Sequence, residues 1–396
     1  MSNAFLRDVY ITAAGAFLPG QPINNEQMET RLGLVGGQQS RYRRRVLKAN
    51  GIEGRHYAID EAGRQTHLNE ELAAEAVRAA VARRGIDLES VQMLSLGTTL
   101  GDTLMPGFAS MVHGRLGGAP MECVSASGVC ASGMTAFRAA YNAVRTGDHE
   151  VAVAGASELA SAMMRGSRFE KESELAPERS ETDASFQYFN ADFLRWMLSD
   201  GAGAVVLEGQ PARSGLSLRV EWVTNTSYAH KYETCMYLGT SRPSGPRVGA
   251  TYLSYPDISQ AERDGLLLVR QDTKLLEQGI MDIVPAEIQK LISRGKLDPG
   301  GVDWFMPHLS SYFFFTRLLR YLEPFGITED KWFTNLKHKG NTGSASIYIM
   351  LEEALNSGML KPGQRVLTMV PESGRFTVSY GLFTVVDGAA AELAAE

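Results

Sequence analysis

Cysteine is scarce in this chain of 396 residues, which has only Cys123, Cys130 and Cys235. Three cysteines are too few for the disulfide framework of a small secreted domain, and we therefore expect a reducing, cytoplasmic compartment. They also lack the spacing of metal ligands, so we expect no metal site. No stretch approaches the roughly 18 uninterrupted apolar residues that a membrane span requires. The sequence thus favours neither a secreted nor a membrane-spanning protein.

Several common site motifs are absent as well. The sequence contains no G-x-x-x-x-G-K-[ST] phosphate loop, no G-x-G-x-x-G after a strand, no H-E-x-x-H and no G-x-S-x-G. Each of these motifs positions a phosphate, a zinc ion or a serine nucleophile. Nucleotide-driven enzymes, zinc proteases and serine esterases therefore lose their support.

Positive charge is in slight deficit, with 39 Lys and Arg against 45 Asp and Glu, for a net charge of −6. An acidic chain is a poor general binder of nucleic acid, because affinity for phosphate rests on a basic surface. One basic stretch stands out, and it contains Arg41, Arg43, Arg44 and Arg45. It has two interpretations, which are a solvated helix face and a docking face for an acidic partner near an active-site mouth.

Buried strands alternate with helices along the chain. Apolar runs at 9–15 and 91–97 predict strands, and the helical spacing of apolar residues at 69–85 predicts a helix. This alternation indicates an α/β sheet. Residues 165–183 mix both signs of charge and predict an exposed loop or lid, whereas residues 237–257, with several prolines and glycines, predict a structured loop.

The two halves of the chain share a weak internal repeat. A helix at 130–147 leads through a polar turn to a buried strand at 151–155, and a helix at 340–358 leads in the same way to a strand at 366–370. The repeat predicts two similar α/β halves packed together, with site residues from both. We expect these halves to span residues 1–210, with an excursion at 165–195, and residues 211–396.

Cys130 has the setting of an activated nucleophile. It follows a predicted strand at 122–126 and begins a helix among small residues. Unpaired N–H groups and the positive end of the helix dipole favour the thiolate at such a position. The alternative is a buried structural cysteine, and we assign that role to Cys123 and Cys235, which lack this context.

Two further residues are candidates for the site. His308 ends an apolar strand at 302–307, and the carboxyl ends of strands are where α/β folds place their sites. Asn341 lies between glycines at a predicted helix start, where its amide can bind an oxyanion without adding charge. The alternatives are a structural histidine and a helix-capping asparagine.

Taken together, these residues and their surroundings resemble the thiolase-fold condensing enzymes, and specifically the β-ketoacyl-acyl-carrier-protein synthase III family. The matching stretches occur in family order over nearly the whole chain. They are ITAAGAFLPGQPINNEQME near the start, TTLGDTLMPGFASMVHGRLG at 98–117, GVCASGM around Cys130, VAVAGASE at 151–158, LSDGAGAVVLE at 198–208, VDWFMPH at 302–308, and KGNTGSASIYIMLEEALNSGMLKPGQRVL at 339–367.

The resemblance implies a five-layered αβαβα thiolase fold of two related halves, and a homodimer. It implies that Cys130 accepts the acyl group, that His308 and Asn341 bind the carbonyl of the second thioester, and that the backbone N–H groups of Cys130 and Gly374 hold the oxyanion. No cofactor is implied, because the substrates arrive as phosphopantetheine thioesters of acyl carrier protein (ACP) or coenzyme A. The implied reaction is a Claisen-type condensation by a ketosynthase.

Some features depart from the family pattern. The C-terminal triple-glycine loop reads PESGRF at 371–376, a bulky run at 312–315 follows His308, and Arg45 stands where members primed by coenzyme A have a tryptophan. These changes resemble the specialised branch that joins two acyl chains, as in dialkylresorcinol, cyclohexanedione and α-pyrone pathways. The basic stretch would favour an acidic carrier protein over free coenzyme A.

Other activities remain as alternatives at this point. The main one is an acyltransferase of the same fold that moves the acyl group from Cys130 to an alcohol or amine, although Asn341 serves an enolate better. A thiolase would need a second cysteine in residues 371–376, which contain none. A papain-like protease and a catalytically silent subunit of a heterodimer have less support.

Large apolar residues near the candidate site could line an acyl tunnel, although at helical or strand spacing such residues also build cores. The candidates are Met105, Phe108, Phe193 and Phe313, together with Met163, Met164, Phe186, Tyr188, Phe189, Trp196 and Phe314. The sequence does not specify the acyl chain.

Overall fold

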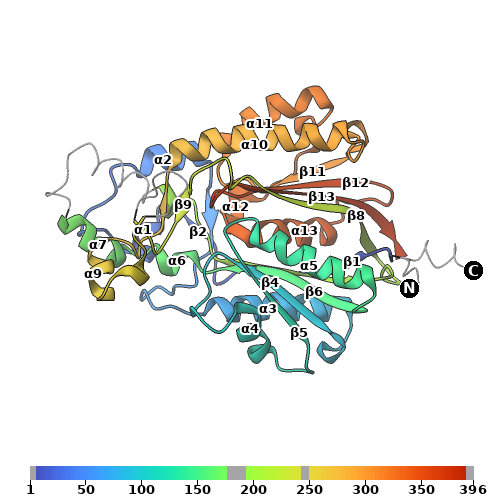
Figure 1. Cartoon of the computed structure of the whole chain (residues 1–396), viewed down its shortest axis with the longest axis horizontal. Helices are drawn as coiled ribbons and strands as arrows, with labels where there is room; N and C mark the ends of the chain where they lie inside the picture. Colours follow the sequence, from blue (N-terminus) through green and yellow to red (C-terminus); the bar gives the residue numbers. More distant parts are fainter. Residues whose placement is uncertain (1–5, 176–192, 242–248, 389–396) are drawn as a thin grey trace, which may run out of the picture.

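Strands and helices alternate along the chain and stack in layers (Figure 1). The computed structural model describes residues 6–175, 193–241 and 249–388. The strands are β1 (Tyr10–Phe17), β2 (Ile23–Asn24), β3 (Gly54–Arg55), β4 (Met93–Thr98), β5 (Glu122–Ser127), β6 (Val151–Glu158), β7 (Gly201–Glu208), β8 (Leu216–Ser227), β9 (Met236–Tyr237), β10 (Arg270–Gln271), β11 (Trp304–Pro307), β12 (Arg365–Pro371) and β13 (Thr377–Asp387). The α-helices are α1 (Met28–Leu32), α2 (Arg43–Asn50), α3 (Asn69–Arg84), α4 (Phe108–Leu116), α5 (Ser132–Thr146), α6 (Ala160–Met163), α7 (Gly166–Leu175), α9 (Ile258–Arg263), α10 (Thr273–Ser293), α11 (Phe315–Leu322), α12 (Leu336–Lys339) and α13 (Ser346–Asn356).

The main sheet has the strand order β11-β12-β13-β8-β1-β7-β6-β4-β5. The order is symmetric about the β1–β8 junction. On one side β7 runs antiparallel to its neighbours β1 and β6, and β4 is parallel to β6. On the other side β13 runs antiparallel to its neighbours β8 and β12, and β11 is parallel to β12. Only β5, which pairs in parallel with β4, has no counterpart. The sheet therefore consists of two halves of like topology, joined where Tyr10 pairs with Arg219 and Ile11 with Leu218.

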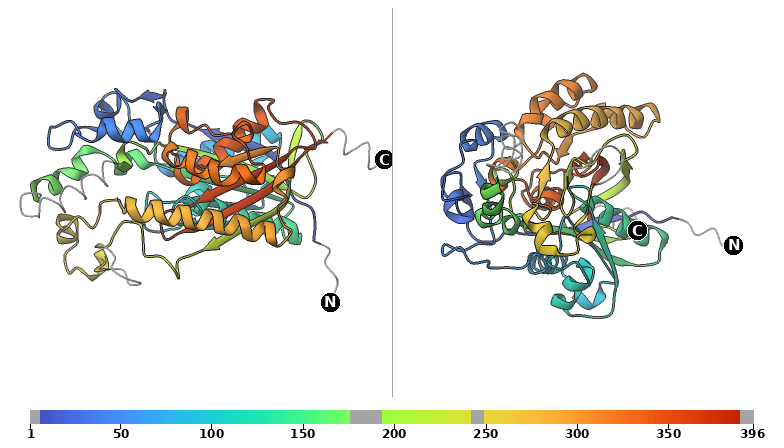
Figure 2. Two further views of the ribbon diagram at one scale, coloured as in Figure 1. Left: turned by 90° about the horizontal axis from the view of Figure 1, so that it is seen from above. Right: turned by 60° about the vertical axis from the view of Figure 1, so that its left-hand side comes forward.

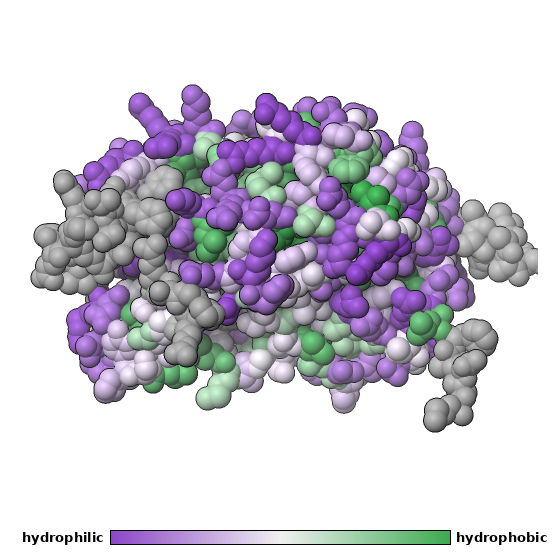
Figure 3. Space-filling view, turned by 45° about the horizontal axis from the view of Figure 1, so that its top comes forward, coloured by the Kyte–Doolittle hydropathy of each residue, from purple (hydrophilic) through white to green (hydrophobic). Residues whose placement is uncertain are grey.

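Five layers follow from this arrangement (Figure 1). Helices α3 and α4 cover the outer face of the first half, and α10 and α11 cover that of the second. Between the halves lie α5, which contacts β4, β6 and β8, and α13, which contacts β1, β7 and β11. The face that carries α10 and α11 is largely hydrophilic (Figure 3), as expected of an outer layer. The predicted αβαβα layering is confirmed.

Small residues allow the layers to approach closely. A Cβ on Gly15 of β1 would lie 2.2 Å from the backbone nitrogen of Ala80, so α3 rests directly on this strand. A Cβ on Gly133 of α5 would lie 2.6 Å from the carbonyl oxygen of Ser344, just before α13. The hydroxyl of Tyr348 in α13 also donates to the carbonyl oxygen of Gly133 at 2.7 Å. The two central helices, one from each half, are therefore in direct contact.

Most of the predicted elements are present. The strands expected at 9–15 and 91–97 are β1 and β4, and the helix expected at 69–85 is α3, which ends at Gly85 in the left-handed conformation. The two repeat units correspond to α5 with β6 and to α13 with β12. The expected division between residues 210 and 211 falls in the connection of β7 to β8, and the exact extent of the two halves stays a prediction.

An exposed loop or a lid was expected at 165–183; a loop is wrong for its first part, which is helical, and the lid stays a prediction. Residues 166–175 form α7, because Phe169 is buried and its ring lies 5.8 Å from the Arg195 guanidinium carbon. Residues 176–192 lie outside the described residues. The segment 237–257 has the expected local structure, with a bridge between Thr240 and Thr251 and a 3₁₀ turn at Tyr252–Ser254, although residues 242–248 are not described.

Three groups of connecting elements gather at one end of the molecule. They are α1 and α2, α6 and α7, and α9 with β9, and all lie at the left in Figure 1 and in the left view of Figure 2. This end holds the larger of the cavities described below. In the part of the chain that the structure describes, no helix is both long and apolar enough to cross a membrane.

Candidate active site

Cys130 lies in the turn between β5 and α5, two residues before the helix begins at Ser132. The thiol therefore has the helix-start position that the sequence predicts. Its turn is tightly packed, because a Cβ on Gly128 would lie 3.2 Å from a carboxylate oxygen of Glu372 and 3.4 Å from the Cβ of Ser132. The Cys130 side chain is buried and borders two cavities.

The larger cavity has a volume of about 770 Å³ and is lined by residues from Cys130 to the connecting elements α6 and β9. Asn341, Glu158, Ser310 and Ser373 also line it. Its apolar lining comes mainly from methionine and leucine, including Met163, Met164, Leu194, Met197, Met236 and Leu238. This volume lies within the range of about 300–1,000 Å³ that is typical of small-molecule sites.

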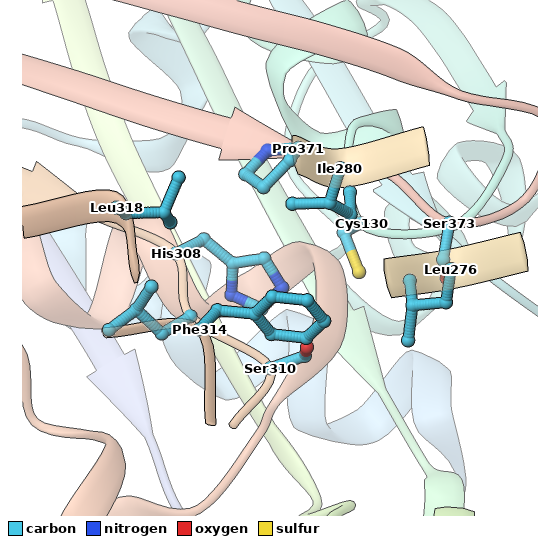
Figure 4. Close-up of a pocket in the computed structure, with 10 residues that line it drawn as sticks. Cys130, Leu276, Ile280, His308, Ser310, Phe314, Leu318, Pro371 and Ser373 are labelled. Atoms are coloured by element: carbon cyan, nitrogen blue, oxygen red, sulfur yellow. The ribbon is translucent and has the colours of Figure 1, made fainter. Parts of the chain in front are cut away.

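The smaller cavity has a volume of about 20 Å³ and also borders the thiol (Figure 4). Leu276 and Ile280 of α10 form one wall, and Phe314 and Leu318 form another. Figure 4 shows the His308 imidazole and the Cys130 thiol directed into this pocket. Cys130, Ser310 and Ser373 border both cavities, so the thiol lies where they meet.

His308 directly follows β11 and is almost completely buried. Its backbone N–H donates to the carbonyl oxygen of Met369 in β12 at 2.7 Å, which fixes the residue at the end of the sheet. Neither ring nitrogen has a hydrogen-bond partner among the described residues. Burial lowers the pKa of His308 to about 4, so the ring is neutral and offers one donor and one acceptor.

Asn341 lies between α12 and α13, and neighbouring backbone orients it. Its backbone N–H donates to the carbonyl oxygen of Met197 at 3.1 Å, and its own carbonyl oxygen accepts from the Ser199 N–H at 2.8 Å. Its side-chain oxygen accepts from the Gly343 N–H at 2.9 Å. With that oxygen engaged, the amide N–H₂ group is the part of the side chain available to donate into the larger cavity.

Two buried carboxylates lie close to the thiol, and the sequence analysis gave neither a role. Glu158 ends β6, and one of its oxygens accepts from the N–H and hydroxyl of Thr99 and of Ser344. Glu372 follows β12 and accepts from the N–H groups of Val129 and Ala131. Burial raises the pKa of Glu158 to about 7 and also raises that of Glu372.

These carboxylates correct the prediction that the helix start favours a thiolate. Burial raises the pKa of the Cys130 thiol well above its ordinary range, and the negative charges of Glu372 and Glu158 raise it further. The opposing effect of the local backbone is the smallest of the four causes. Cys130 therefore rests as a neutral thiol, because desolvation and two like charges outweigh the helix start.

Two sequence families match this chain. Residues 58–187, which include Cys130, match the thiolase N-terminal domain, and residues 292–377, which include His308 and Asn341, match the C-terminal part of 3-oxoacyl-[acyl-carrier-protein] synthase III. The β-ketoacyl-[acyl-carrier-protein] synthase III of Dinoroseobacter shibae is 25% identical over 358 residues, which are 90% of this chain and 93% of that protein. The chain is a synthase III-like acyltransferase.

Solved structures agree on the fold of this synthase III-like chain. AbyA1, a tetronic acid condensing enzyme, superposes with a TM-score of 0.73 at 22% identity over 95% of this chain and 99% of its own. OleA of Xanthomonas campestris superposes with a TM-score of 0.71 at 19% identity over 96% of this chain and 99% of its own. The predicted thiolase-like α/β fold is confirmed.

Gly374 was predicted to donate its N–H to the oxyanion. The structure places it next to the nucleophile turn, because a Cβ there would lie 2.9 Å from a methyl group of Val129. Its carbonyl oxygen accepts from the Cys235 N–H at 2.9 Å, which fixes the loop. Ser373 borders both cavities, whereas Gly374 is not among their lining residues, and the oxyanion role of Gly374 stays a prediction.

The candidate tunnel residues have mixed positions in the synthase III-like fold. Met105 is 84% exposed and Phe313 is 40% exposed, whereas Phe108 is buried in the core beside α3 and Phe193 packs partly buried against another core. None of these four is among the lining residues of either cavity.

The remaining candidates also divide. Met163 and Met164 line the large cavity, Phe314 lines the small one, and Trp196 is buried in a core. Phe186, Tyr188 and Phe189 lie outside the described residues. Apolar character predicts burial but does not distinguish a cavity wall from a core.

The basic stretch is divided between structure and surface. Arg43 begins α2 and forms ion pairs with Glu26 at 3.0 Å and with the buried Glu29 at 3.6 Å, so it stabilises this region from within. Arg41, Arg44 and Arg45 are exposed. The docking prediction therefore applies to these three and not to Arg43.

Proposed function

We propose that this enzyme takes an acyl group onto Cys130 and joins it, in a Claisen-type condensation, to a second acyl or β-ketoacyl thioester. The observation that carries this proposal is the position of the thiol where two cavities meet. One cavity contains a neutral imidazole without a partner among the described residues, and the other contains an amide donor. A thiol close to two such donors can hold one acyl group while the second thioester is activated beside it.

In the first half-reaction the Cys130 sulfur attacks the carbonyl carbon of an incoming thioester. The new S–C bond forms, the bond to the carrier sulfur breaks, and the thiol proton passes to the departing carrier thiolate. Because Cys130 rests protonated, the proton must leave as the bond forms, and His308, with an unprotonated ring nitrogen, lies in the same pocket to receive and return it. The N–H groups of Cys130 and Gly374 are the proposed oxyanion donors.

In the second half-reaction His308 and Asn341 bind the carbonyl oxygen of the extender thioester. Decarboxylation or deprotonation of that thioester produces an enolate, whose oxygen both side chains stabilise by hydrogen bonds. The enolate carbon attacks the acyl carbonyl on Cys130, the C–C bond forms and the S–C bond breaks. The released Cys130 thiolate then takes up a proton, either from solvent or the one removed from the extender, to restore the thiol. Two uncharged donors suit this step because they bind the developing charge without binding a resting anion.

The lining of the larger cavity supports an extended acyl chain as the substrate. Met163, Met164, Met197 and Met236 contribute flexible, polarisable side chains that adapt to an alkyl chain. AbyA1 is by its description a tetronic acid condensing enzyme. Its similarity and the departures at 312–315 and 371–376 support a specialised condensing role in polyketide or fatty-acid-derived metabolism rather than chain initiation.

We also propose that Arg41, Arg44 and Arg45 dock an acidic acyl carrier protein. Their side chains are exposed around the start of α2 and would meet a negative surface. The double variant Arg44→Glu with Arg45→Glu should lower kcat/KM for ACP-bound acyl groups about tenfold and leave coenzyme A thioesters within about twofold. A matched double charge reversal elsewhere on the surface, Arg213→Glu with Lys361→Glu, should leave kcat/KM unchanged for both acyl donors. An equal loss with both donors would contradict docking at this face.

We also propose that the enzyme is a cytoplasmic homodimer, and the exposed edge of the sheet supports the dimer. Strand β5 ends the sheet and is largely exposed, and the nearby side chains of Leu104 and Met105 are 82% and 84% exposed. Exposed apolar side chains beside an unpaired strand edge are typical of an interface. Light scattering should give twice the monomer mass, and Leu104→Asp with Met105→Asp should shift it towards the monomer. A wild-type monomer would contradict the proposal.

The decisive experiment is an intact-mass measurement after incubation with acyl-ACP and acyl-coenzyme A donors. The wild-type enzyme should gain the mass of one acyl group, and Cys130→Ala should gain none. Cys123→Ala, at the half-buried cysteine of β5, is the matched control and should acylate normally. The absence of an adduct with every donor tested would contradict the proposed function.

A further inference from the structure

Glu158 and Glu372 occupy equivalent places in the two halves of the molecule. In the first half Ala152 of β6 pairs with Met93, the first residue of β4, and in the second half Val366 of β12 pairs with Trp304, the first residue of β11. Glu158 lies six residues after Ala152, and Glu372 lies six residues after Val366. The internal repeat thus places a carboxylate at the end of both central strands.

Each carboxylate binds the start of the opposite half's central helix. Glu158 accepts from Ser344, two residues before α13 begins, and Glu372 accepts from Ala131, immediately before α5 begins. Negative charge at a helix start is stabilised by the free N–H groups there. The resemblance to synthase III predicted a glycine-rich loop at 371–376, so the second member of this pair is a feature of this chain.

Glu372 also connects the nucleophile turn to its own loop. One carboxylate oxygen accepts from the N–H groups of Val129 and Ala131 at 3.1 and 3.2 Å, on either side of Cys130. The backbone N–H of Arg375 also hydrogen-bonds to this carboxylate. A Cβ on Gly374 would lie 3.1 Å from the other oxygen. The carboxylate therefore fills the space between the backbones of Cys130 and Gly374.

From this arrangement we propose that Glu372 is a positioning residue for acyl transfer. It holds the backbones of Cys130 and Gly374 at the spacing needed to bind the oxyanion, and its charge keeps Cys130 in the unreactive thiol form until a thioester is bound. The inference rests on the proposed function for its first part. The second part concerns the thiol alone and can be tested without a substrate.

The groups around the thiol agree with this role. Cys130 faces the Glu372 carboxylate from the β12–β13 loop, the Glu158 carboxylate from β6 and the neutral His308 from the end of β11. The Arg375 guanidinium, on the same loop as Glu372, donates to the carbonyl oxygen of Tyr232 at 3.3 Å. Burial and these two carboxylates raise the thiol pKa, so the resting enzyme resists alkylation and oxidation at neutral pH.

The experiment measures the rate at which iodoacetamide alkylates Cys130 as a function of pH, by intact mass, in a Cys123→Ala background. Wild-type alkylation should have a midpoint above 9.0, the ordinary value for a cysteine. Glu372→Gln removes the charge and should lower the midpoint by about one pH unit. Glu372→Asp keeps the charge but is one methylene shorter, so it should keep the wild-type midpoint.

The same variants are then assayed for acyl loading. Both should acylate more than tenfold more slowly than the wild type, because each disturbs the connection between the two loops. Asp148→Asn removes a carboxylate beyond the opposite end of α5 and should change neither the alkylation midpoint nor the acylation rate.

Two results would overturn the proposal. One is a Glu372→Gln enzyme with a wild-type midpoint and acylation within twofold of normal. The other is a midpoint below pH 7 with Glu372 intact, and this measurement needs no substitution at Glu372. Failure of every acyl donor would contradict the proposed condensation instead, and the alkylation profile would still test the effect of Glu372 on the thiol.

Discussion

The two halves of this molecule have the same topology but different chemistry at the starts of their central helices. In the first half the helix start carries the thiol of Cys130, and in the second it is preceded by the amide of Asn341. The carboxylates that hold these starts differ too. Glu158 binds two hydroxyls as well as two N–H groups, whereas Glu372 accepts from the backbone N–H groups of Val129, Ala131 and Arg375. Duplication thus supplies the scaffold, and a few substituted side chains give each half its role.

Removing the hydrogen-bond donors of the second half tests most directly whether the two halves have different roles. His308→Ala and Asn341→Ala should each lower the rate of carbon–carbon bond formation by about 10²–10³-fold, because each removes a hydrogen bond to the enolate oxygen. Loading of Cys130 should stay within a few-fold of the wild type. Product is measured by mass spectrometry after the adduct has formed. Asn356→Ala, at the far end of α13, is the control.

One outcome of this experiment would change the assignment. If Asn341→Ala keeps full turnover, an enolate is not the species that the site stabilises. Transfer of the acyl group to an alcohol or amine would then be the better account of the enzyme.

The carboxylate of the first half should give a pH-dependent stability. Burial raises the pKa of Glu158 from 4.5 to about 7, so the folded state favours the protonated form. The stability that the protonated carboxyl of Glu158 contributes to the folded state is fully present below pH 4.5 and is lost as pH rises through 7. Between those values Glu158→Gln should gain up to about 3 kcal/mol in unfolding free energy relative to the wild type.

Urea titrations at pH 4.5 and pH 7 measure this difference. The exposed Glu89→Gln should run parallel to the wild type at both values. A Glu158→Gln enzyme whose stability also runs parallel to the wild type would show that burial does not penalise the charged form of Glu158.

A side chain added at Gly133 of α5 should destabilise the contact between the two halves. Gly133→Ala places a Cβ 2.6 Å from the carbonyl oxygen of Ser344 and should cost about 1–3 kcal/mol of stability. Gly114→Ala is the matched control, because it lies in α4 with no atom within 4 Å of the new Cβ, and it should stabilise by up to about 1 kcal/mol. Thermal unfolding measures both. Equal effects of the two substitutions would contradict close packing at Gly133.

A smaller effect is expected from the hydrogen bond that joins the central helices. Tyr348→Phe removes a buried hydroxyl that donates to the carbonyl oxygen of Gly133 at 2.7 Å, and it should cost about 1 kcal/mol. Tyr255→Phe removes a solvent-exposed bond to Asp264 and should stay within about 0.5 kcal/mol of the wild type. Denaturant unfolding separates them, and a neutral Tyr348→Phe would show that packing alone joins the halves.

Much of the fold and the three central residues could be predicted because their signals are local. The helix at 69–85 and the strands at 9–15 and 91–97 follow from the spacing of apolar residues within each segment. Cys130, His308 and Asn341 each stand at a junction of strand, turn and helix that is readable from a few neighbouring residues. Local pattern also distinguished Cys130, which borders both cavities, from Cys123 and Cys235, which line neither of them.

Other features could not be predicted because their partners are distant. Glu372 binds residues 241 and 243 positions away, and Glu158 binds Ser344 at a separation of 186. The sequence predicted a thiolate at Cys130, and the burial and the Glu372 carboxylate that raise the thiol pKa arise only when the halves pack. The core position of Phe108, a candidate tunnel residue, could not be predicted for the same reason, since apolar character does not reveal which surface a side chain meets.

The sequence by itself therefore indicated most of the strands and helices, the repeat and the candidate site residues, because each is recognised from neighbours in the chain. The tertiary structure alone decided which side chains surround the thiol, which protonation state they impose and where the cavities lie. Burial and charge act through space, and the two halves bring their groups to one point only after they fold together.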